Sequence, residues 1–413
     1  MKRVYSIVLV ALSIVVLAWF LPWLYSLVFP VAGSDPFVAM SPVCDGLVVS
    51  ELGDNTGKEI FLADADGQPT GNTITKEERD SLLPQIYFTQ LMARGIMPDT
   101  IKGIEASMQN LKHGQWVFST IPHDVNKVLP EVYLIMESMP ARIDLEDPDE
   151  VFRFRDGKVE FIEMATNTVN SKRTERFTQV FNDRGFTLPL RSWSANITSR
   201  KAYDNGYLLA DANGDIFHLK MQAGRPYMVK LDKPDSLVAE HVFVMENIDG
   251  LFLGFVTDTE NNLYAIEQDG YGIVPLAVGK FDPEKERMMV TKNIFNTVYK
   301  ISGEEGTRWT AIDSRTYEPI ARYARTWTPS LSEKVEEYIF PFALSFTSTS
   351  DSLAKPRIDF VSWHAVFLNI VLAIIVVVVF RRRRRSVPCT VCAVVLTLVS
   401  GIFAFIPYML IHN

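Results

Sequence analysis

Three long stretches without a charged residue constrain this chain more than any other feature. They cover residues 4–29, 361–380 and 386–413, and every one of the 49 Asp and Glu lies between the first and the second. A bilayer core about 30 Å thick needs about 20 apolar residues in a helix that rises about 1.5 Å per residue. All three stretches reach that length, and only helices or closed barrels satisfy their backbone in lipid. We therefore predict three transmembrane helices.

The basic residues predict how these helices are oriented, because basic side chains near membrane ends stay in the cytoplasm. One group precedes the first helix and a second separates the other two: Lys2 and Arg3, and Arg381, Arg382, Arg383, Arg384 and Arg385. Both groups face the cytoplasm if the middle of the chain and the C-terminus at Asn413 face outward. A patch for nucleic acid or anionic lipid is the alternative for the arginine run. Its position between two spans favours a topology signal.

A cleavable signal peptide is the alternative for the first stretch. The apolar core of a signal peptide has about 7–15 residues, and the uncharged run here is longer. It also carries Trp19, Trp23 and Tyr25 where an interfacial aromatic belt is expected. We therefore predict an anchor that is not cleaved, although Val31-Ala32-Gly33 is a poor match to a cleavage site.

These features divide the chain into six segments. We predict an N-terminal anchor over 1–33, an outer domain over 34–345, a linker over 346–360, a transmembrane helix over 361–380, an arginine loop over 381–385 and a last transmembrane helix over 386–413. Between the first two spans, 34 Lys and Arg against 49 Asp and Glu give a formal charge of −15. This charge argues against nucleic acid as a partner. Cys44 is the sole cysteine there, so the outer domain has no internal disulfide.

Turn dipeptides between runs rich in Val, Ile, Phe, Tyr and Leu predict that the outer domain is mainly β. They are Asp66-Gly67, Asp156-Gly157, Asn205-Gly206, Asn213-Gly214, Asp249-Gly250 and Asp269-Gly270. The acidic turns at Asp64 and Asp211 are similar to the start of a calcium loop but lack its distal Glu, so we predict plain turns. Capping boxes that begin at Thr75 and Ser330 predict helical insertions.

The strand and turn units repeat along the chain. Matching segments begin at Ile60, Ile216, Leu263 and Trp309, with a shorter copy at Phe152. The last three full copies are 47 and 46 residues apart, and Ile60 and Phe152 are separated by 92, twice 46. A period of about 40–50 residues with several strands per unit is typical of propeller blades.

The segments Leu263-Tyr-Ala-Ile-Glu and Trp309-Thr-Ala-Ile-Asp resemble the strand of quinoprotein-like β-propeller repeats, although no copy has the Thr-Gly turn of those repeats. The predicted fold is therefore mainly β: a propeller-like periplasmic domain with helical insertions, plus three transmembrane helices. Quinone-dependent enzymes and scaffold propellers share this resemblance, so it does not define a function.

Catalytic and metal-binding motifs are scarce. The outer domain holds His113, His123, His218 and His241 without an i, i+4 pair, and the chain has no G-x-S-x-G or Walker motif. For His218, within a predicted strand, a surface or packed histidine is the default interpretation. Cys389-x-x-Cys392 opens a hydrophobic helix, where packing is favoured over a redox pair. We predict no catalytic residue, no cofactor and no metal.

Two further segments, Leu82–Met92 and Glu131–Met139, together with this arrangement, resemble an uncharacterised family of Gram-negative envelope proteins, a domain of unknown function. The resemblance implies a bacterial inner-membrane protein with most of the chain in the periplasm. It also implies a link to ABC-type transporters, because members of this family tend to be encoded beside transporter components. It defines no functional residues.

Two functions remain open. The first is a membrane-anchored periplasmic binding or accessory subunit, with a transporter permease or ATPase complex as its partner in the inner membrane. The second is a membrane-bound periplasmic enzyme, quinone-dependent or hydrolytic; the scarcity of catalytic motifs favours the first. We expect the C-terminal helices to dock on the partner through polar and small residues, namely His364, Asn369, Ser400, Gly401 and Ala404. The alternative is that these two helices pack only against each other.

Overall fold

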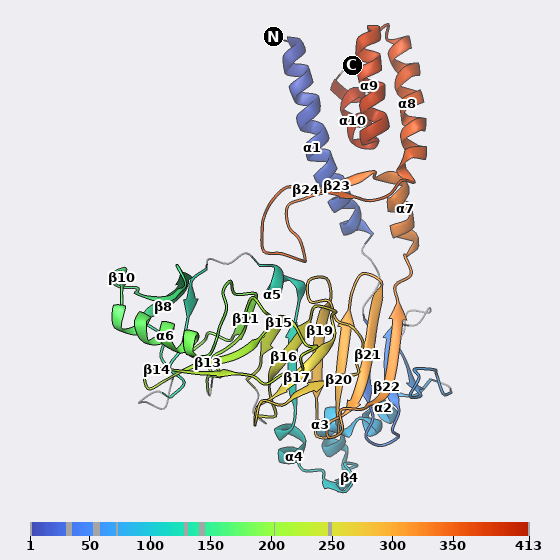
Figure 1. The fold of residues 1–413 in the computed structure, drawn as a ribbon. Helices are drawn as coiled ribbons and strands as arrows, with labels where there is room; N and C mark the ends of the chain where they lie inside the picture. Colours follow the sequence, from blue (N-terminus) through green and yellow to red (C-terminus); the bar gives the residue numbers. More distant parts are fainter. Residues whose placement is uncertain are drawn as a thin grey trace. The chain divides into compact units, whose positions relative to one another are not determined.

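The computed structural model describes residues 2–29, 35–52, 58–71, 73–127, 131–139, 145–201, 203–246 and 250–411 (Figure 1). The chain divides into two compact units. The helical unit comprises Met1–Ser34 and Trp327–Asn413, and the sheet unit comprises Asp35–Thr326. The sheet unit is mainly β and ends before α7, which the sequence analysis placed in the outer domain.

Five antiparallel sheets, built largely of consecutive strands, form the sheet unit. The first sheet is β1 (Phe37–Met40), β2 (Leu47–Leu52) and β3 (Lys58–Ala63), and the second is β7 (Tyr133–Leu134), β8 (Glu150–Arg155), β9 (Lys158–Glu163) and β10 (Thr168–Val169). The third is β11 (Ser192–Ala195), β12 (Tyr207–Ala210), β13 (Ile216–Gln222) and β14 (Arg225–Lys230). The fourth is β15 (Ala239–Val244), β16 (Phe252–Asp258), β17 (Leu263–Glu267) and β18 (Ile273–Pro275). The fifth is β19 (Arg287–Lys292), β20 (Asn296–Ser302), β21 (Gly306–Asp313) and β22 (Pro319–Thr326), and β6 (Trp116–Thr120) pairs with β19 as an extra edge strand.

The sheets stack face to face, as propeller blades do (Figure 1). Alternation along the strands directs Leu209 and Phe217 of the third sheet toward the second, and Leu208 and Ile216 toward the fourth. Further apolar clusters join the fourth sheet to the fifth and the fifth to the first. Among the described residues no such cluster joins the first sheet to the second, so the propeller-like stack is not a closed ring.

The predicted repeat is confirmed for four of its five segments. Ile60, Ile216, Leu263 and Trp309 each lie in the third strand of their sheet, if β6 is set aside. The segment at Phe152 lies in the second strand, β8, so that part of the alignment is wrong. The Asp156-Gly157 turn connects β8 to β9, the second and third strands of that sheet. Asn213-Gly214 likewise follows the second strand of its sheet, β12, so a turn dipeptide does not by itself identify a third strand.

The predicted turns at Asp64 and Asp211 are also confirmed. In both, the carboxylate Oδ1 accepts hydrogen bonds from the backbone N–H groups two and four residues further on, at 2.8–3.0 Å. The turn predicted at Asp249 lies outside the described residues.

Short helices and one hairpin connect the sheets: α2 (Lys76–Leu82), α3 (Pro84–Arg94), β4 (Thr100–Ile101), β5 (Ile104–Glu105), α4 (Met108–His113), α5 (Pro122–Asn126) and α6 (Ser171–Asp183). The capping box predicted at Thr75 is present, with Glu78 bonded back to the backbone of Thr75. At Pro84 the chain starts a new helix: α2 stops at Leu82, and α3 begins with Pro84 in its first turn, where the missing N–H costs nothing.

The helical unit contains α1 (Lys2–Val28), α7 (Leu331–Ile339), β23 (Phe342–Ser345), β24 (Arg357–Phe360), α8 (Ala365–Arg382), α9 (Val387–Ser400) and α10 (Ile402–Ile411). Two of its helices are long and apolar enough to cross a membrane, over Tyr5–Val28 and Ala365–Arg382. Val10 and Phe380 share a cluster, so the N-terminal end of α1 lies beside the C-terminal end of α8. The two basic groups of the sequence therefore lie at the same end of this unit.

The third predicted span is not one helix. It breaks at Gly401, whose φ of 56° and ψ of −129° suit glycine alone, into helices roughly 21 and 15 Å long. Phe403 packs with Ala18 and Phe340, whereas Tyr408 packs with Phe380, so α10 turns back toward the arginine run. The prediction that the C-terminus lies at the opposite end from the arginines is corrected: Ile411 lies at the arginine end.

Candidate functional site

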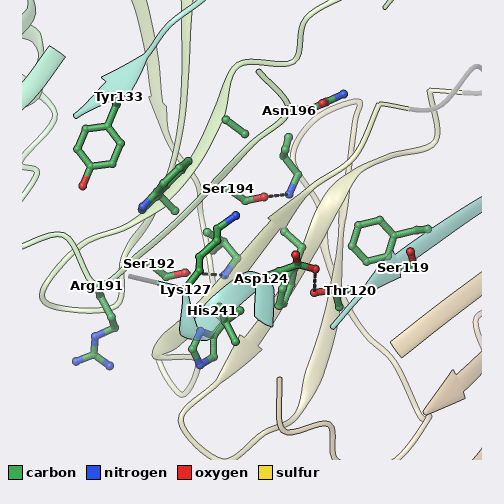
Figure 2. A pocket seen from close by; sticks show the side chains of 17 residues that line it. Ser119, Thr120, Asp124, Lys127, Tyr133, Arg191, Ser192, Ser194, Asn196 and His241 are labelled. Atoms are coloured by element: carbon green, nitrogen blue, oxygen red, sulfur yellow. Dashed lines mark hydrogen bonds between the residues drawn. The ribbon is translucent and has the colours of Figure 1, made fainter. Parts of the chain in front are cut away.

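A cavity of about 590 Å³ lies among strands β6, β11 and β15, which are edge strands of the fifth, third and fourth sheets. Its walls are residues 191–196 of the segment around β11 and residues 241–244 of β15, and β6 and α5 close it with Ser119, Thr120, Asp124, Val125 and Lys127 (Figure 2). We call this cavity the inner pocket. It belongs to no single sheet, because the stack brings the edge strands of three sheets together.

Two serines hold the pocket walls together. Ser192 Oγ accepts a hydrogen bond from the Val242 N–H at 3.2 Å, and Ser194 Oγ accepts one from the Val244 N–H at 2.9 Å. These N–H groups point away from β16, so the serine hydroxyls satisfy an open sheet edge that would otherwise be unpaired. Each hydroxyl still has its own hydrogen to donate to a molecule in the pocket.

Charged side chains in the pocket lining are mostly basic. Arg191 donates to Glu240 Oε2 at 2.7 Å, and Asp124 Oδ2, in the first turn of α5, accepts from the N–H of the N-cap residue Ile121 at 3.0 Å. Burial lowers the pKa of His241, although the nearby Glu284 carboxylate partly opposes this effect, so the ring is neutral at pH 7. Lys127 is exposed at the pocket, and among the described residues no carboxylate pairs with it. The pocket therefore offers, within an acidic domain, an ammonium group that no carboxylate of the described residues neutralises.

Aromatic rings line two sides of the pocket. Tyr133 and Trp193 meet edge to face with centroids 5.1 Å apart, and Phe118 and Phe243 do so at 6.3 Å. Rings of this kind supply flat apolar surface beside the polar groups. The lining combines hydroxyl, amide, cationic and aromatic groups, which suits a small polar ligand.

A buried ionic network adjoins the pocket through Asn196, whose Nδ2 donates to Glu246 Oε2 at 2.7 Å. Lys201 Nζ lies 2.6 Å from both Asp204 Oδ1 and Glu246 Oε1, and all three side chains are less than a tenth exposed. The Asn205 N–H also donates to Glu246, at 2.8 Å. Every charge in this network has a partner, so it fixes the loop before β12 rather than offering a free reactive group.

His218 lies beside this network and is fully buried. Its Nε2 is 2.6 Å from the Asn205 carbonyl oxygen, so that nitrogen donates, and its Nδ1 accepts from the Tyr271 hydroxyl at 2.9 Å. Both ring nitrogens are thus satisfied in the neutral form. Burial lowers the pKa of His218 to about 4. His218 is a packed core histidine, one of the two default interpretations of the sequence.

The residues singled out for topology and docking lie in the helical unit. The five arginines end α8 and form the turn after it, with their side chains exposed, whereas the side chains of Lys2 and Arg3 lie outside the described part. His364 occupies the N-cap position of α8 without a side-chain capping bond, stacks on Tyr338, and its Nδ1 lies 3.3 Å from Glu337 Oε2. Asn369, Ser400 and Ala404 are buried inside the unit, and Asn369 Nδ2 donates to the Leu398 carbonyl at 3.1 Å. Docking through this face stays a prediction.

Sequence reasoning missed the inner pocket. Lys127, Arg191 and His241 come from three segments separated by about 50 residues or more, and no motif connects them. The alternating serines Ser192 and Ser194 were the only local signal, because hydroxyls on one face of an apolar strand need partners. Among the described residues, no group of three or more His, Cys, Asp and Glu is placed to hold a metal ion.

Comparison with protein families identifies the sheet unit. A family model described as a domain of unknown function, DUF4857, matches residues 37–312. The chain belongs to the DUF4857 family. The match confirms the resemblance expected from the sequence, and both segments that carried it lie within the matched part of this DUF4857 protein. No curated protein matches the chain.

Solved structures similar to this DUF4857 protein include propellers. The β-propeller domain of Myceliophteria thermophila Cps50 (Swd1) is 15% identical with a TM-score of 0.26, covering 55% of this chain and 62% of that one. Kuenenia stuttgartiensis hydrazine synthase is 10% identical with a TM-score of 0.26, covering 54% of this chain and 53% of that one. The Dos1 propeller is 12% identical with a TM-score of 0.25, covering 59% of this chain and 73% of that one. The matched part of this chain thus covers less than two thirds of the length of the first two of these proteins. The propeller-like description rests on the stacked sheets themselves.

Proposed function

We propose that this protein is a membrane-anchored periplasmic binding subunit whose inner pocket takes a small solute bearing a carboxylate or phosphate. The observation that carries the proposal is the inner pocket itself. It gathers Lys127, Arg191 and the hydroxyls of Ser192 and Ser194 in a unit that is strongly acidic elsewhere. A Lys ammonium beside hydroxyl donors is a common way to hold an anionic oxygen.

The helical unit supports the anchoring part of the proposal. Helices α1 and α8 would span roughly 40 and 27 Å, against a bilayer core about 30 Å thick. The windows that fit a membrane are mostly exposed, only 17% and 28% buried. Trp363 and Phe360, beside the start of α8, are exposed aromatics suited to the membrane interface. With the basic ends in the cytoplasm, the sheet unit follows on the outer side.

The same proposal includes a partner in the inner membrane, part of an ABC-type transporter. Its support is the family resemblance given by the sequence, since members of that family are expected beside transporter components. A re-entrant pair such as α9 and α10 would present two short helices to a permease. Protein mass spectrometry of the chain purified from its own membrane in mild detergent tests this part, and a preparation without a transporter component contradicts it.

Replacing Lys127 by Glu tests the pocket. The full chain in mild detergent is expected to bind citrate or inorganic phosphate, and Lys127→Glu is expected to weaken that binding about tenfold, because a charge-assisted hydrogen bond is lost and a repulsion is gained. Equilibrium dialysis measures the affinity. Lys172→Glu, the same charge change on an exposed turn of α6, is the matched control and is expected to leave binding unchanged. Failure to bind either anion, or equal loss in both variants, contradicts the proposal.

A further inference from the structure

A second cavity of about 280 Å³ lies between the first and fifth sheets, and it shares no residue with the inner pocket. Val38 of β1, Val298 of β20 and Trp309 of β21 form buried apolar walls. Phe37, Ile86 and Met289 surround it and are 37–42% exposed. We call it the Gln85 cavity, after one of the polar side chains in its lining.

Gln85 is the feature that gives this cavity chemical character. It lies in the first turn of α3 and is 1% exposed. Its Nε2 donates to the Met40 carbonyl at 3.2 Å, and its backbone carbonyl accepts from Gln115 Nε2 at 2.6 Å. Its side-chain Oε1 is buried and has no partner among the described residues.

The orientation of this amide is fixed by its neighbour. A flip of the Gln85 side chain would set Oε1 against the Met40 carbonyl, so that two acceptors would face each other. The orphan atom is therefore the oxygen, and what it lacks is a hydrogen-bond donor. A buried acceptor in a native protein normally has a partner, and here the residue that carries it is among those lining a cavity.

The rest of the cavity limits what that donor can belong to. The lining also includes Lys300 and Asp35, which form an ion pair in which both charges are already satisfied, and the Lys300 ammonium lies 5.7 Å from the Trp309 ring. Water would need two to four polar partners, whereas the remaining walls are mainly apolar. A cavity of about 150 Å³ holds one benzene, so this volume suits a molecule of one or two fused rings.

We propose that the Gln85 cavity is a second ligand site, for a small and mainly apolar molecule with a single N–H or O–H group that donates to Gln85 Oε1. The exposed apolar rim of Phe37, Ile86 and Met289 lies where such a molecule would enter and covers its apolar part. The site does not depend on the function proposed for the inner pocket.

Indole and indene test this site, because they have the same shape and only indole has a ring N–H. The readout is the alkylation rate of Met289→Cys in the full chain in mild detergent, with Cys44, Cys389 and Cys392 replaced by Ser. Saturating indole is expected to slow alkylation at least fivefold, and indene is expected to slow it less than twofold. Equal protection by both molecules, or protection by neither, overturns the proposal.

Gln85→Met provides the second arm, since Met has nearly the same length and no acceptor of comparable strength. The difference between indole and indene is expected to disappear in this variant. A preference for indole that survives Gln85→Met contradicts the role of this oxygen. If Gln85→Met fails to fold, the comparison of indole with indene in the Gln85 protein still decides the proposal.

Discussion

Lowering the pH from about 6.5 to about 4 is expected to destabilise the sheet unit by roughly 3 kcal/mol through His218 alone. The folded state keeps this imidazole neutral, with a pKa of about 4, because burial removes water from it. In the unfolded chain the pKa returns to about 6.5. Between these values only the unfolded chain binds the proton, so stability is complete above pH 6.5 and falls as the pH drops toward 4.

The groups around His218 do not cancel this effect. Lys220 lowers its pKa further, whereas the Asn205 carbonyl and the Asp204 carboxylate raise it, and burial outweighs both. Protonation would also place an N–H at Nδ1, where the Tyr271 hydroxyl now donates. The cost therefore combines an unsolvated charge with a disrupted hydrogen bond.

His218→Gln isolates the contribution of this one side chain. Denaturant unfolding of the full chain at pH 7 and at pH 4.5 gives the pH dependence for each protein. The wild type is expected to lose more stability between these pH values than His218→Gln, and the control His123→Gln is expected to follow the wild type. If the curves for the wild type and His218→Gln are parallel, His218 does not titrate as described.

Gly401→Leu is expected to abolish the reversal between α9 and α10. A side chain at this position would overlap Asn369 Oδ1, and a residue with a Cβ is strained by roughly 1–3 kcal/mol at this φ and ψ. Without the reversal, residues 387–411 would form a helix of roughly 37 Å, long enough to cross the bilayer. The C-terminus would then move to the periplasmic side.

A phosphatase fused after Ile411 measures this change. The fusion is expected to be inactive in the wild type and active in Gly401→Leu, and Ser400→Ala, which leaves Gly401 in place, is expected to match the wild type. An inactive Gly401→Leu fusion in an intact, membrane-bound chain contradicts the role given to Gly401. An inactive Gly401→Leu fusion would not test the separate prediction that Gly401 is a helix-docking residue.

Local chemistry made much of the fold predictable. The turn dipeptides, the capping boxes and the period of about 46 residues all depend on neighbouring residues, and they located several hairpin turns, two helices and four of the five aligned strands, although Asn205-Gly206 lies in the long loop before β12 and forms no turn. The order of stacking was not predictable, because it depends on which faces of distant strands match. The first sheet packs on the fifth, nearly 250 residues further on.

The break at Gly401 was missed for a related reason. Hydropathy measures composition, and the composition of residues 386–413 satisfies a single span. What divides the segment is the backbone conformation of the single residue Gly401. Glycine permits such a break and also lets two helices pack closely, and the sequence analysis assigned Gly401 only the second role. Pro407, inside α10, gives no sequence signal for the position of the break.

Neither candidate site could be predicted from the sequence. Lys127 and Gln85 are ordinary surface residue types, and each becomes informative only when its surroundings are known: one lacks an ion-pair partner among the described residues and the other lacks a donor for its oxygen. The absence of catalytic motifs directed the sequence analysis toward a binding role. It gave no position for the ligand.

The most direct test of the account is phosphatase activity at three positions of the wild-type chain. Fusion after Pro356, which lies in the helical unit between β23 and β24 and before α8, is expected to be active. Fusions after Arg385 and after Ile411 are expected to be inactive, because the basic groups and the returning helix α10 lie at one end of the helical unit. An inactive fusion at Pro356 with an active one at Arg385 would contradict a membrane-anchored periplasmic binding subunit.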